Sequence, residues 1–583
     1  MAKLLKHLKP YALQVFAVFT LVLGQVMADL ELPDLMAKIV NEGIIGQDNS
    51  VILNTGFWML LIALSGAACS VGVGFLSSRI ATGFSMNLRE KVFSKVEGFS
   101  LKEFDRFSTA SLITRSTNDI QQIQILFVML LRMVLTAPLM GFGAIIKAYD
   151  AAPSMTWIIA LVLLGMVGIT LALFSIAMPK FRLLQELVDR LNLVTRQNLT
   201  GLRVVRAFNA EKFEEANFER ANANLTKVSL YVNRLTAAMQ PMMMLLLNFI
   251  AITVIWVGSH EIDAEHLMVG DMIAFMQYAM QVVFSFLFIS FIFMMLPRAL
   301  VSAQRVAEVI ETEPTVKDPE HPIAFPANMR GVIEFKNVSF YYSEADSPVL
   351  KDISFTAHPG EITAFIGSTG SGKSTLINLI LRFYDVSDGQ VLVNGIDVRL
   401  VKQKDLRDMI GYVPQKAVLF SGTVCSNIKY GAPEASDEEM QEAARIAQAS
   451  EFIENFDTRF ESPIAQSGAN ISGGQKQRLA IARAIIKKPQ IYIFDDSFSA
   501  LDFRTDAALR EELSKEIKGA TVLIVAQRIS TIIDADKIIV LDEGRIVGTG
   551  THTELMKSCD IYREIAFSQL SEEELKSTVE SPV

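Results

Sequence analysis

Cysteine is scarce in this chain, and the sequence has no surplus of positive charge. Its three cysteines, Cys69, Cys425 and Cys559, are scattered without metal-ligand spacing, which argues against a disulfide framework and favours free thiols in a reducing compartment. The net charge is −9, and no broad basic face is evident, which argues against a nucleic-acid partner. No small-residue cleavage pattern follows the first apolar run, so that run is interpreted as an uncleaved span.

Long apolar runs fill the first half of the chain, which is 51% hydrophobic overall. Such runs are long enough to cross about 30 Å of hydrocarbon at 10–45, 53–80, 126–148, 155–178, 236–258 and 270–297. Lys and Arg are absent from the short loops 46–50, 149–154 and 259–271 and frequent in the two long loops. The positive-inside rule therefore predicts that both termini and the long loops are cytoplasmic.

Several groups of residues in this half leave two interpretations open. Asp29, Glu31 and Asp34 of the first span could attract cationic substrates. They could equally lie at the outer interface, because 10–28 already forms about 28 Å of helix. Stretches 100–113 and 200–213 are candidate contacts to a soluble part or plain helix packing. A further set suits either an adaptable apolar cavity or packing against lipid and helices: Met239, Met242, Met243, Met244, Phe275, Phe284, Phe286, Phe288, Phe291 and Phe293.

A phosphate-binding loop follows a proline-rich linker at 312–330. The apolar strand candidate 362–367 runs directly into GSTGSGKST, and a helical pattern follows, which is the context that the G-x-x-x-x-G-K-[ST] motif requires. Backbone N–H groups and the helix N-terminus would face the phosphates of ATP, Lys373 would neutralise them, and the Ser374 hydroxyl would bind Mg²⁺. The predicted nucleotide-binding residues of this loop are Gly367, Ser368, Thr369, Gly370, Ser371, Gly372, Lys373, Ser374 and Thr375.

Two further motifs belong to the same chemistry. The strand candidate 490–495 ends at Asp495, which is placed to hold Mg²⁺ through water. The segment ISGGQKQRLAIARA at 471–484 reads as a Ser-Gly-Gly turn that opens a helix and offers a second set of N–H donors to a phosphate. One chain would have to fold back on itself to bring both the phosphate loop and this turn to the same nucleotide. We therefore expect the turn to cover a nucleotide held by a second copy or a partner.

These motifs and the six spans together resemble ATP-binding cassette (ABC) exporters of the half-transporter type, from Leu4 to about Leu570. The resemblance implies that Tyr342 stacks on adenine and that Gln415 contacts Mg²⁺ and the loops of the membrane half. It also implies that Ser472, Gly473, Gly474 and Gln475 reach the γ-phosphate in the opposite subunit, and that Ser499–Asp502 crosses the dimer interface. The two short cytoplasmic stretches would be coupling helices, the second docking on the partner's nucleotide domain.

Two positions depart from the family pattern. Active members resemble one another in having Glu after the metal-binding Asp, where this chain has Asp496, and His in the later switch strand, where it has Gln527. The shorter side chain displaces a carboxylate by over about 1 Å, which can cost on the order of 10²-fold in rate. Glutamine in place of histidine keeps a hydrogen-bond donor for the γ-phosphate, but it lacks the imidazole ring, which can exchange protons near neutral pH. Together the changes predict a site that binds ATP and cleaves it poorly.

The predicted fold is an all-α six-helix transmembrane domain (1–311), a linker (312–330), an α/β P-loop NTPase domain with an antiparallel β subdomain and a helical subdomain (331–570), and a tail (571–583). The predicted function is export of amphipathic or hydrophobic, drug-like compounds from the bacterial cytoplasm, as one subunit of a heterodimer. Its own site would be degenerate, resembling such subunits in bacterial multidrug exporters. A slow homodimeric exporter and an ATP-gated channel or regulator are the alternatives.

Overall fold

The computed structural model describes residues 6–326, 330–342 and 347–569, and the chain divides into two compact units. One unit consists of Met1–Glu97 and Thr109–Thr312, and the other of Gly98–Ser108 and Glu313–Val583. The short segment Gly98–Ser108 thus clusters with the second unit, although the sequence-based division placed it in the first domain. The side chains of Met239 and Phe293, two of the candidate cavity residues, lie outside the described set.

The first unit is helical, and the residues that the structure describes contain six helices that are long and apolar enough to cross a membrane. This confirms the predicted number of spans. Several extend well beyond a bilayer, since about 20 residues suffice to cross it. The elements are η1 (Lys6–Tyr11), α2 (Ala12–Lys38), η2 (Ile39–Ile45), α3 (Asn49–Glu97), α5 (Thr109–Thr114), η3 (Arg115–Asp119), α6 (Ile120–Met129), η4 (Leu130–Val134), α7 (Leu135–Ala151), η5 (Pro153–Met155), α8 (Trp157–Thr200), α9 (Leu202–Ala207), α10 (Glu211–Asp263) and α11 (Val269–Glu311).

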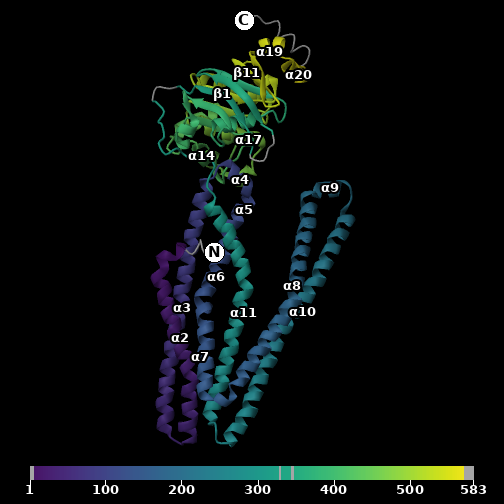
Figure 1. Cartoon of the computed structure of the whole chain (residues 1–583). Coiled ribbons are helices and arrows are strands. Elements are labelled where there is room, and N and C mark those ends of the chain that lie inside the picture. The colour runs from purple at the N-terminus through teal and green to yellow at the C-terminus, as the bar shows by residue number, and fades with distance from the viewer. Residues whose placement is uncertain (1–5, 327–329, 343–346, 570–583) are drawn as a thin grey trace. The chain divides into compact units, whose positions relative to one another are not determined.

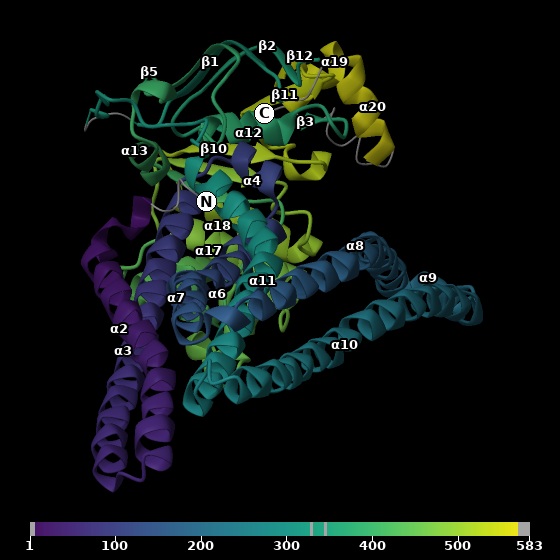
Figure 2. The ribbon, with the colours of Figure 1, turned by 60° about the horizontal axis from the view of Figure 1, so that its bottom comes forward.

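Within this unit, α2 packs along α3, and α11 packs along α7 and α2. Val18, Val22 and Val26 follow one face of α2 at a spacing of one turn and are buried in the core of the unit, as helical periodicity requires. The long helices α8 and α10 lie side by side, with the short α9 at their common end (Figures 1 and 2). The stretch 200–213 therefore forms the turn between two long helices.

The second unit begins with the short helix α4 (Leu101–Phe107) and continues as an α/β domain. A six-stranded sheet has the order β12-β11-β3-β10-β9-β6, and a second, four-stranded antiparallel sheet has the order β2-β1-β4-β5. The strands are β1 (Ile333–Phe340), β2 (Leu350–Ala357), β3 (Ile362–Gly367), β4 (Asp388–Val393), β5 (Ile396–Asp397), β6 (Ile410–Val413), β7 (Gly422–Thr423), β8 (Pro463–Ile464), β9 (Ile491–Asp495), β10 (Thr521–Val525), β11 (Lys537–Asp542) and β12 (Arg545–Gly550).

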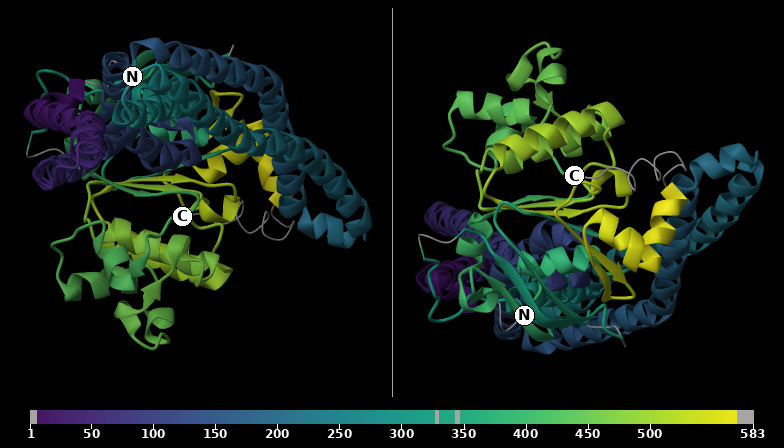
Figure 3. Two further views of the ribbon diagram at one scale, coloured as in Figure 1. Left: turned by 90° about the horizontal axis from the view of Figure 1, so that it is seen from below. Right: turned by 90° about the horizontal axis from the view of Figure 1, so that it is seen from above.

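Helices cover the six-stranded sheet and form a subdomain on one of its sides. Figure 3 shows the green segment around residues 430–485 gathered on that side of the strands. These helices are α12 (Lys373–Ile380), α13 (Gln403–Asp408), α14 (Val424–Lys429), α15 (Asp437–Ile446), α16 (Ser450–Glu454), α17 (Gly473–Ile485), α18 (Phe503–Glu516), α19 (His552–Ser558) and α20 (Asp560–Gln569), with short 3₁₀ turns η6 to η9 between them. The predicted fold class, with its antiparallel and helical subdomains, is thereby confirmed.

Five of the six strands run parallel, because β3 pairs in parallel with β10 and β11, and β9 with β10 and β6. Their residues are buried on both faces; Ile491 and Ile493 of β9, for example, have no exposed surface. Such continuous apolar strands are typical of a parallel sheet covered on both sides. Ligands of open parallel sheets bind beyond the carboxyl ends of the strands, and here β3 ends at Gly367 and β9 at Asp495.

Candidate nucleotide-binding site

The phosphate loop joins the end of β3 to the start of α12. Gly370 and Gly372 have φ of +85° and +99°, in the left-handed region of backbone conformation, where residues other than glycine are strained. A Cβ at Gly372 would lie 2.6 Å from Cδ2 of Leu350, so glycine is also required there by space. Nζ of Lys373 donates to the carbonyl oxygens of Gly367 (2.9 Å) and Ser368 (2.8 Å), and burial lowers its pKa. The loop thus curls around an ammonium group with its N–H groups at a helix N-terminus, as a phosphate cradle requires.

Hard oxygen ligands for a magnesium ion lie beside this loop. The Ser374 hydroxyl on α12 is 3.4 Å from Oδ1 of Asp495 at the end of β9. Burial raises the pKa of Asp495, and the neighbouring carboxylate of Asp496 adds to the effect. No group of three or more His, Cys, Asp or Glu that could hold a metal occurs within the described residues. The pair therefore fits Mg²⁺, which usually takes one or two protein oxygens and completes its shell with phosphates and water.

Asp496 is held by hydrogen bonds from two other segments, one at Gln415 and the other at the end of β10. Its backbone has φ of +48°, and its N–H donates to the carbonyl oxygen of Val525 at 2.9 Å. Its Oδ2 accepts hydrogen bonds from Nε2 of Gln415 (3.1 Å) and Nε2 of Gln527 (2.9 Å). The side chain is 9% exposed, and burial raises its pKa. The two residues that depart from the family pattern, Asp496 and Gln527, are therefore direct hydrogen-bond partners.

An aromatic cluster lies beside the phosphate loop. The Tyr342 hydroxyl is 3.1 Å from Oγ1 of Thr375 on α12, and its ring contacts those of Phe340 and Tyr384 edge-on at centroid distances of 5.0 and 5.4 Å. Tyr342 is partly buried. The structure thus brings the predicted adenine-binding tyrosine next to a predicted phosphate-loop residue.

Tyr384 connects this cluster to α4 within the same unit. Its hydroxyl donates to Oδ2 of Asp105 at 3.2 Å. The same helix is held at its start by Glu103, which is 5% exposed and accepts hydrogen bonds from Ser100 and from the backbone N–H of Thr315. Sequence analysis gave stretch 100–113 as a candidate contact element or plain helix packing, and it did not predict the role of Tyr384, because an aromatic residue after a helix is an ordinary core residue in any sequence.

The Ser-Gly-Gly turn is built as a helix start. Ser472 is the N-cap of α17; its Oγ accepts from the Gln475 N–H, and the Gln475 side chain accepts from the Ser472 N–H, which is a capping box. A Cβ at Gly473 would meet nothing within 4 Å. Among the described residues, no hydrogen bond joins this turn to the phosphate loop.

The acidic residues of the first span are engaged within the helical unit. Nζ of Lys147 on α7 lies 2.6 Å from Oδ2 of Asp34 and 3.2 Å from Oε2 of Glu31. Tyr278 of α11 donates to Oδ1 of Asp34 at 2.6 Å. Three helices are thus joined by one polar cluster, which favours a structural role for these acids. Of the candidate cavity residues, Phe275 and Met243 are buried, whereas Met244, Phe284, Phe288 and Phe291 are exposed.

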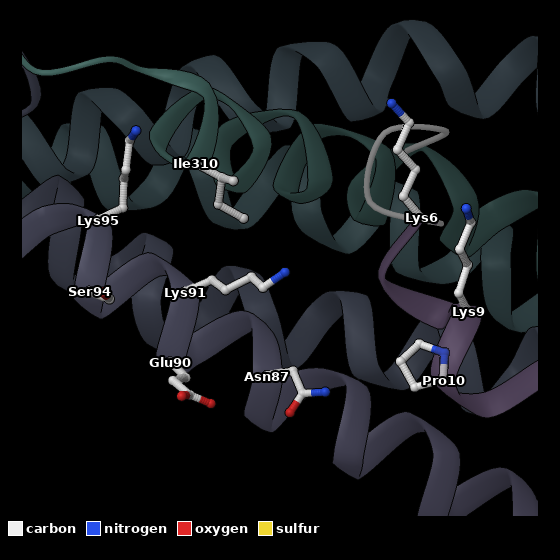
Figure 4. A pocket seen from close by; sticks show the side chains of 9 residues that line it. All are labelled: Lys6, Lys9, Pro10, Asn87, Glu90, Lys91, Ser94, Lys95 and Ile310. Carbon is white, nitrogen blue, oxygen red and sulfur yellow. The ribbon is translucent and has the colours of Figure 1, made fainter. Parts of the chain in front are cut away.

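A basic hollow of about 590 Å³ lies at the end of α3 near the start of the first span. Lys6 and Lys9 line it from η1, and Lys91 and Lys95 from α3, with Glu90 as the one acidic residue of its lining (Figure 4). Lysines gathered where a span begins are typical of the cytoplasmic side of a membrane protein.

The fold and the site together define an ATP-dependent membrane transporter. The family model for the ABC transporter transmembrane region matches residues 15–286, and the ABC transporter model matches residues 350–499. The chain is 42% identical to an uncharacterized ABC transporter ATP-binding protein of Mycobacterium tuberculosis over 98% of both chains. It is 31% identical to the mitochondrial potassium channel ATP-binding subunit of Mus musculus, over 99% of this chain and 82% of that one.

The structure agrees with these sequence relationships. A bacterial Atm1-family ABC exporter with ATP bound matches it with a TM-score of 0.79 at 26% identity, covering 96% of this chain and 99% of that chain. The chain therefore belongs to the ABC transporter family, as an exporter half-transporter in which a membrane domain is joined to an ATP-binding cassette.

Proposed function

We propose that this half-transporter works in a heterodimer with a homologous subunit and exports amphipathic or hydrophobic, drug-like compounds by alternating access. Its bacterial relatives favour the bacterial plasma membrane. The lysine-rich and lysine-free loops favour cytoplasmic termini and a cytoplasmic cassette. ATP binding closes the two cassettes and turns the spans outward, and hydrolysis resets them.

The chain's own cradle holds ATP and Mg²⁺. Gly367 to Thr375 bind the phosphates, Tyr342 stacks on adenine, and Ser374, Gln415 and Asp495 take part in holding Mg²⁺. The ion would neutralise charge on the β- and γ-phosphates. Support comes from the curled loop around Lys373, from the oxygen pair Ser374 and Asp495, and from the proximity of Tyr342 to Thr375.

The observation that carries the degenerate assignment is the pair of amide donors on Asp496. A general base must reach the proton of the attacking water with an oxygen free to accept it. Oδ2 of Asp496 already accepts from Gln415 and Gln527, so only Oδ1 is left to face a water, on a side chain one methylene shorter than that of glutamate. This cradle therefore holds ATP for long periods, with Asp496 and Gln527 as a weak catalytic pair.

The Ser-Gly-Gly turn at 472–475 acts on the ATP held by the partner subunit. Ser472, Gly473, Gly474 and Gln475 form a capped helix N-terminus, and no hydrogen bond among the described residues joins it to the phosphate loop of the same chain. Such an end suits the γ-phosphate of an ATP held by the opposite subunit. Hydrolysis then occurs mainly in the partner's cradle.

The experiment is to compare the purified chain alone with the chain co-purified from its native membrane with its companion. We expect the pair to hydrolyse ATP and transport solute, and the lone chain to bind ATP with little turnover. Brisk turnover and transport by the lone chain, abolished by Lys373→Ala, would instead establish the homodimeric exporter.

A second candidate is an ATP-gated channel, favoured by the similarity to the mitochondrial potassium channel ATP-binding subunit of the mouse. Sealed vesicles distinguish the two. Accumulation of solute against its gradient upon ATP hydrolysis supports the exporter, whereas ATP-dependent movement of ions down their gradient supports the channel.

A further inference from the structure

Arg132 is the only charged residue between Asp119 and Lys147 in the third span. About 28 Å of helix separates it from the end of α7 at Ala151, at a rise of about 1.5 Å per residue. In a hydrocarbon layer about 30 Å thick, this places the guanidinium near the boundary opposite to the 149–154 loop. Long Arg side chains near the ends of spans reach the interface between hydrocarbon and head groups, so a charge at this level can meet the head group of an amphiphile.

The guanidinium lies against the backbone of α3 at Gly74, where no side chain keeps it away. Its Nη2 donates to the carbonyl oxygen of Gly74 at 2.9 Å and to Oγ of Ser78 at 3.4 Å. A Cβ at Gly74 would lie 3.0 Å from Nη2, so the absence of a side chain allows this approach. Within the described part of the chain, Nε and Nη1 of Arg132 make no hydrogen bond to protein. Arginine has five N–H donors in a fork suited to carboxylate and phosphate, and several of them remain for a ligand.

A hollow of about 300 Å³ opens beside this side chain, at the lower end of the range of about 300–1,000 Å³ for ligand pockets. Its lining comes from α2, α3, η4, α7 and α11 and includes Gln25, Ser70, Val71, Arg132, Met133 and Phe288. No Asp or Glu is among its described lining residues. One cation, a few neutral polar groups and apolar walls therefore surround a single space.

We propose that this hollow binds the oxyanion head group of an anionic amphiphile, with Arg132 as the specificity-determining residue. The carboxylate or phosphate accepts from the guanidinium, and the alkyl chain lies along Val71, Met133 and Phe288. The depth of Arg132 matches the level at which the head group of a lipid-like molecule lies. The inference rests on the proposed function, since it names the class of amphiphile exported.

The acidic groups nearby do not favour a cationic ligand. Glu31 and Asp34 form ion pairs with Lys147, and the Asp29 carboxylate is hydrogen-bonded by Gln25. The substrate preference inferred from the tertiary contacts is therefore opposite in charge to the one that the acidic residues of the first span indicate. If Arg132 only joined η4 to α3, the hollow would not distinguish anionic from cationic ligands. The test therefore compares the binding of ligands that differ in charge.

The experiment measures equilibrium binding to the full chain, with any companion that co-purifies, in a non-ionic maltoside detergent without nucleotide. The probes are dodecyl phosphate, dodecanoate and, as a cation of similar length, dodecyltrimethylammonium. We expect at least one oxyanion to bind with saturation and Arg132→Gln to weaken it about 10- to 100-fold, as for a hydrogen-bonded charge. Preference for phosphate or for carboxylate distinguishes the two head groups.

Arg79→Gln is the matched control, because Arg79 is an exposed arginine on the same helix as Gly74 but does not line the hollow. It should bind like the unmodified chain. Gly74→Ala keeps the charge but displaces the guanidinium, and it should weaken binding even if Arg132→Gln fails to fold. Equal binding by the folded Arg132→Gln and Gly74→Ala variants, or equal binding of the cation, would overturn the inference. Because no nucleotide is present, failure here is separate from failure of ATP-driven export.

Discussion

Nε2 of Gln527 donates a 2.9 Å hydrogen bond to Oδ2 of Asp496. The two positions that the sequence resemblance predicts to weaken hydrolysis in this cassette therefore form one contact. Gln415 donates to the same oxygen, so two side-chain amides hold one oxygen of the carboxylate. A change at either position alters the hydrogen bonding of the other. A double-mutant cycle on Asp496 and Gln527 should therefore give an interaction free energy different from zero.

Restoring glutamate and histidine should activate the site. Asp496→Glu together with Gln527→His extends the carboxylate and removes one amide donor from it, and we expect ATPase activity in the assembled pair to rise on the order of 10-fold or more. Phosphate release in a pair whose partner site is inactivated measures this. Asp495→Asn in the same background is the control and should abolish the gain. An unchanged rate in the double variant would contradict the geometric argument.

Ser472→Ala should disable the pair's main hydrolysis while leaving ATP binding in this chain's own cradle intact. The change removes a hydroxyl at the proposed γ-phosphate contact and also an N-cap, which alone costs about 0.5–2 kcal/mol of stability. Ser436→Ala is a matched control, because Ser436 caps α15 through an equivalent capping box with Glu439. Both variants should lose similar stability in thermal unfolding, and only Ser472→Ala should lose turnover. Equal turnover in the two would count against a role for the turn.

Tyr384→Phe should weaken the coupling of nucleotide to the membrane domain. The variant keeps the ring that packs on Tyr342 but removes the hydroxyl that donates to Asp105 of α4. We expect ATP affinity to stay within about two-fold, because a phenyl ring preserves the packing, and the ratio of transport to hydrolysis to fall. Asp105→Asn should act in the same direction.

Tyr341→Phe serves as the control for that experiment. Tyr341 precedes Tyr342 in the chain and is exposed, and its hydroxyl forms no hydrogen bond among the described residues. Transport and ATPase measured in the same vesicles give the ratio. A ratio in Tyr384→Phe equal to that of Tyr341→Phe would remove the proposed link.

The stability of the cassette should decline with acid through His552. Burial lowers the pKa of His552, and its Nδ1 lies 2.7 Å from the Tyr562 hydroxyl. Because the folded state favours the neutral ring, the contribution is present above the unfolded value near 6.5 and is lost as the pH falls below it. His552→Gln should therefore flatten the pH dependence of the ATP-stabilised calorimetric transition below about pH 6.5. The exposed His358→Gln should leave it unchanged, and an equal effect of the two would contradict this account.

Much of the local structure could be predicted from the sequence because its causes are local. An apolar run of sufficient length predicts a span, and the six spans were found. An apolar strand followed by glycines and a helical pattern predicts a phosphate loop, and β3, the loop and α12 have that order. The capping box at Ser472 likewise depends on residues three positions apart.

Contacts between distant segments could not be read in this way. Tyr384 and Asp105 are 279 residues apart, and Lys147 and Asp34 are 113 apart. No periodicity carries information over such distances, since side-chain direction and packing are set by the whole fold. Arg132 is visible in the sequence as a single charge within an apolar run, but its approach to Gly74 follows only from the packing of η4 against α3.

The sequence by itself determined the class of this protein, its spans and the order of strand, glycine-rich loop and helix around its phosphate loop, because composition and short-range spacing decide these. Only the tertiary structure decided that Gln415 and Gln527 donate to one oxygen of Asp496, and that Arg132 faces a hollow whose described lining residues include no Asp or Glu. The physical reason is that hydrogen bonds and cavities depend on atoms brought within a few ångströms by packing, whereas helices, strands and turns follow largely from neighbouring residues.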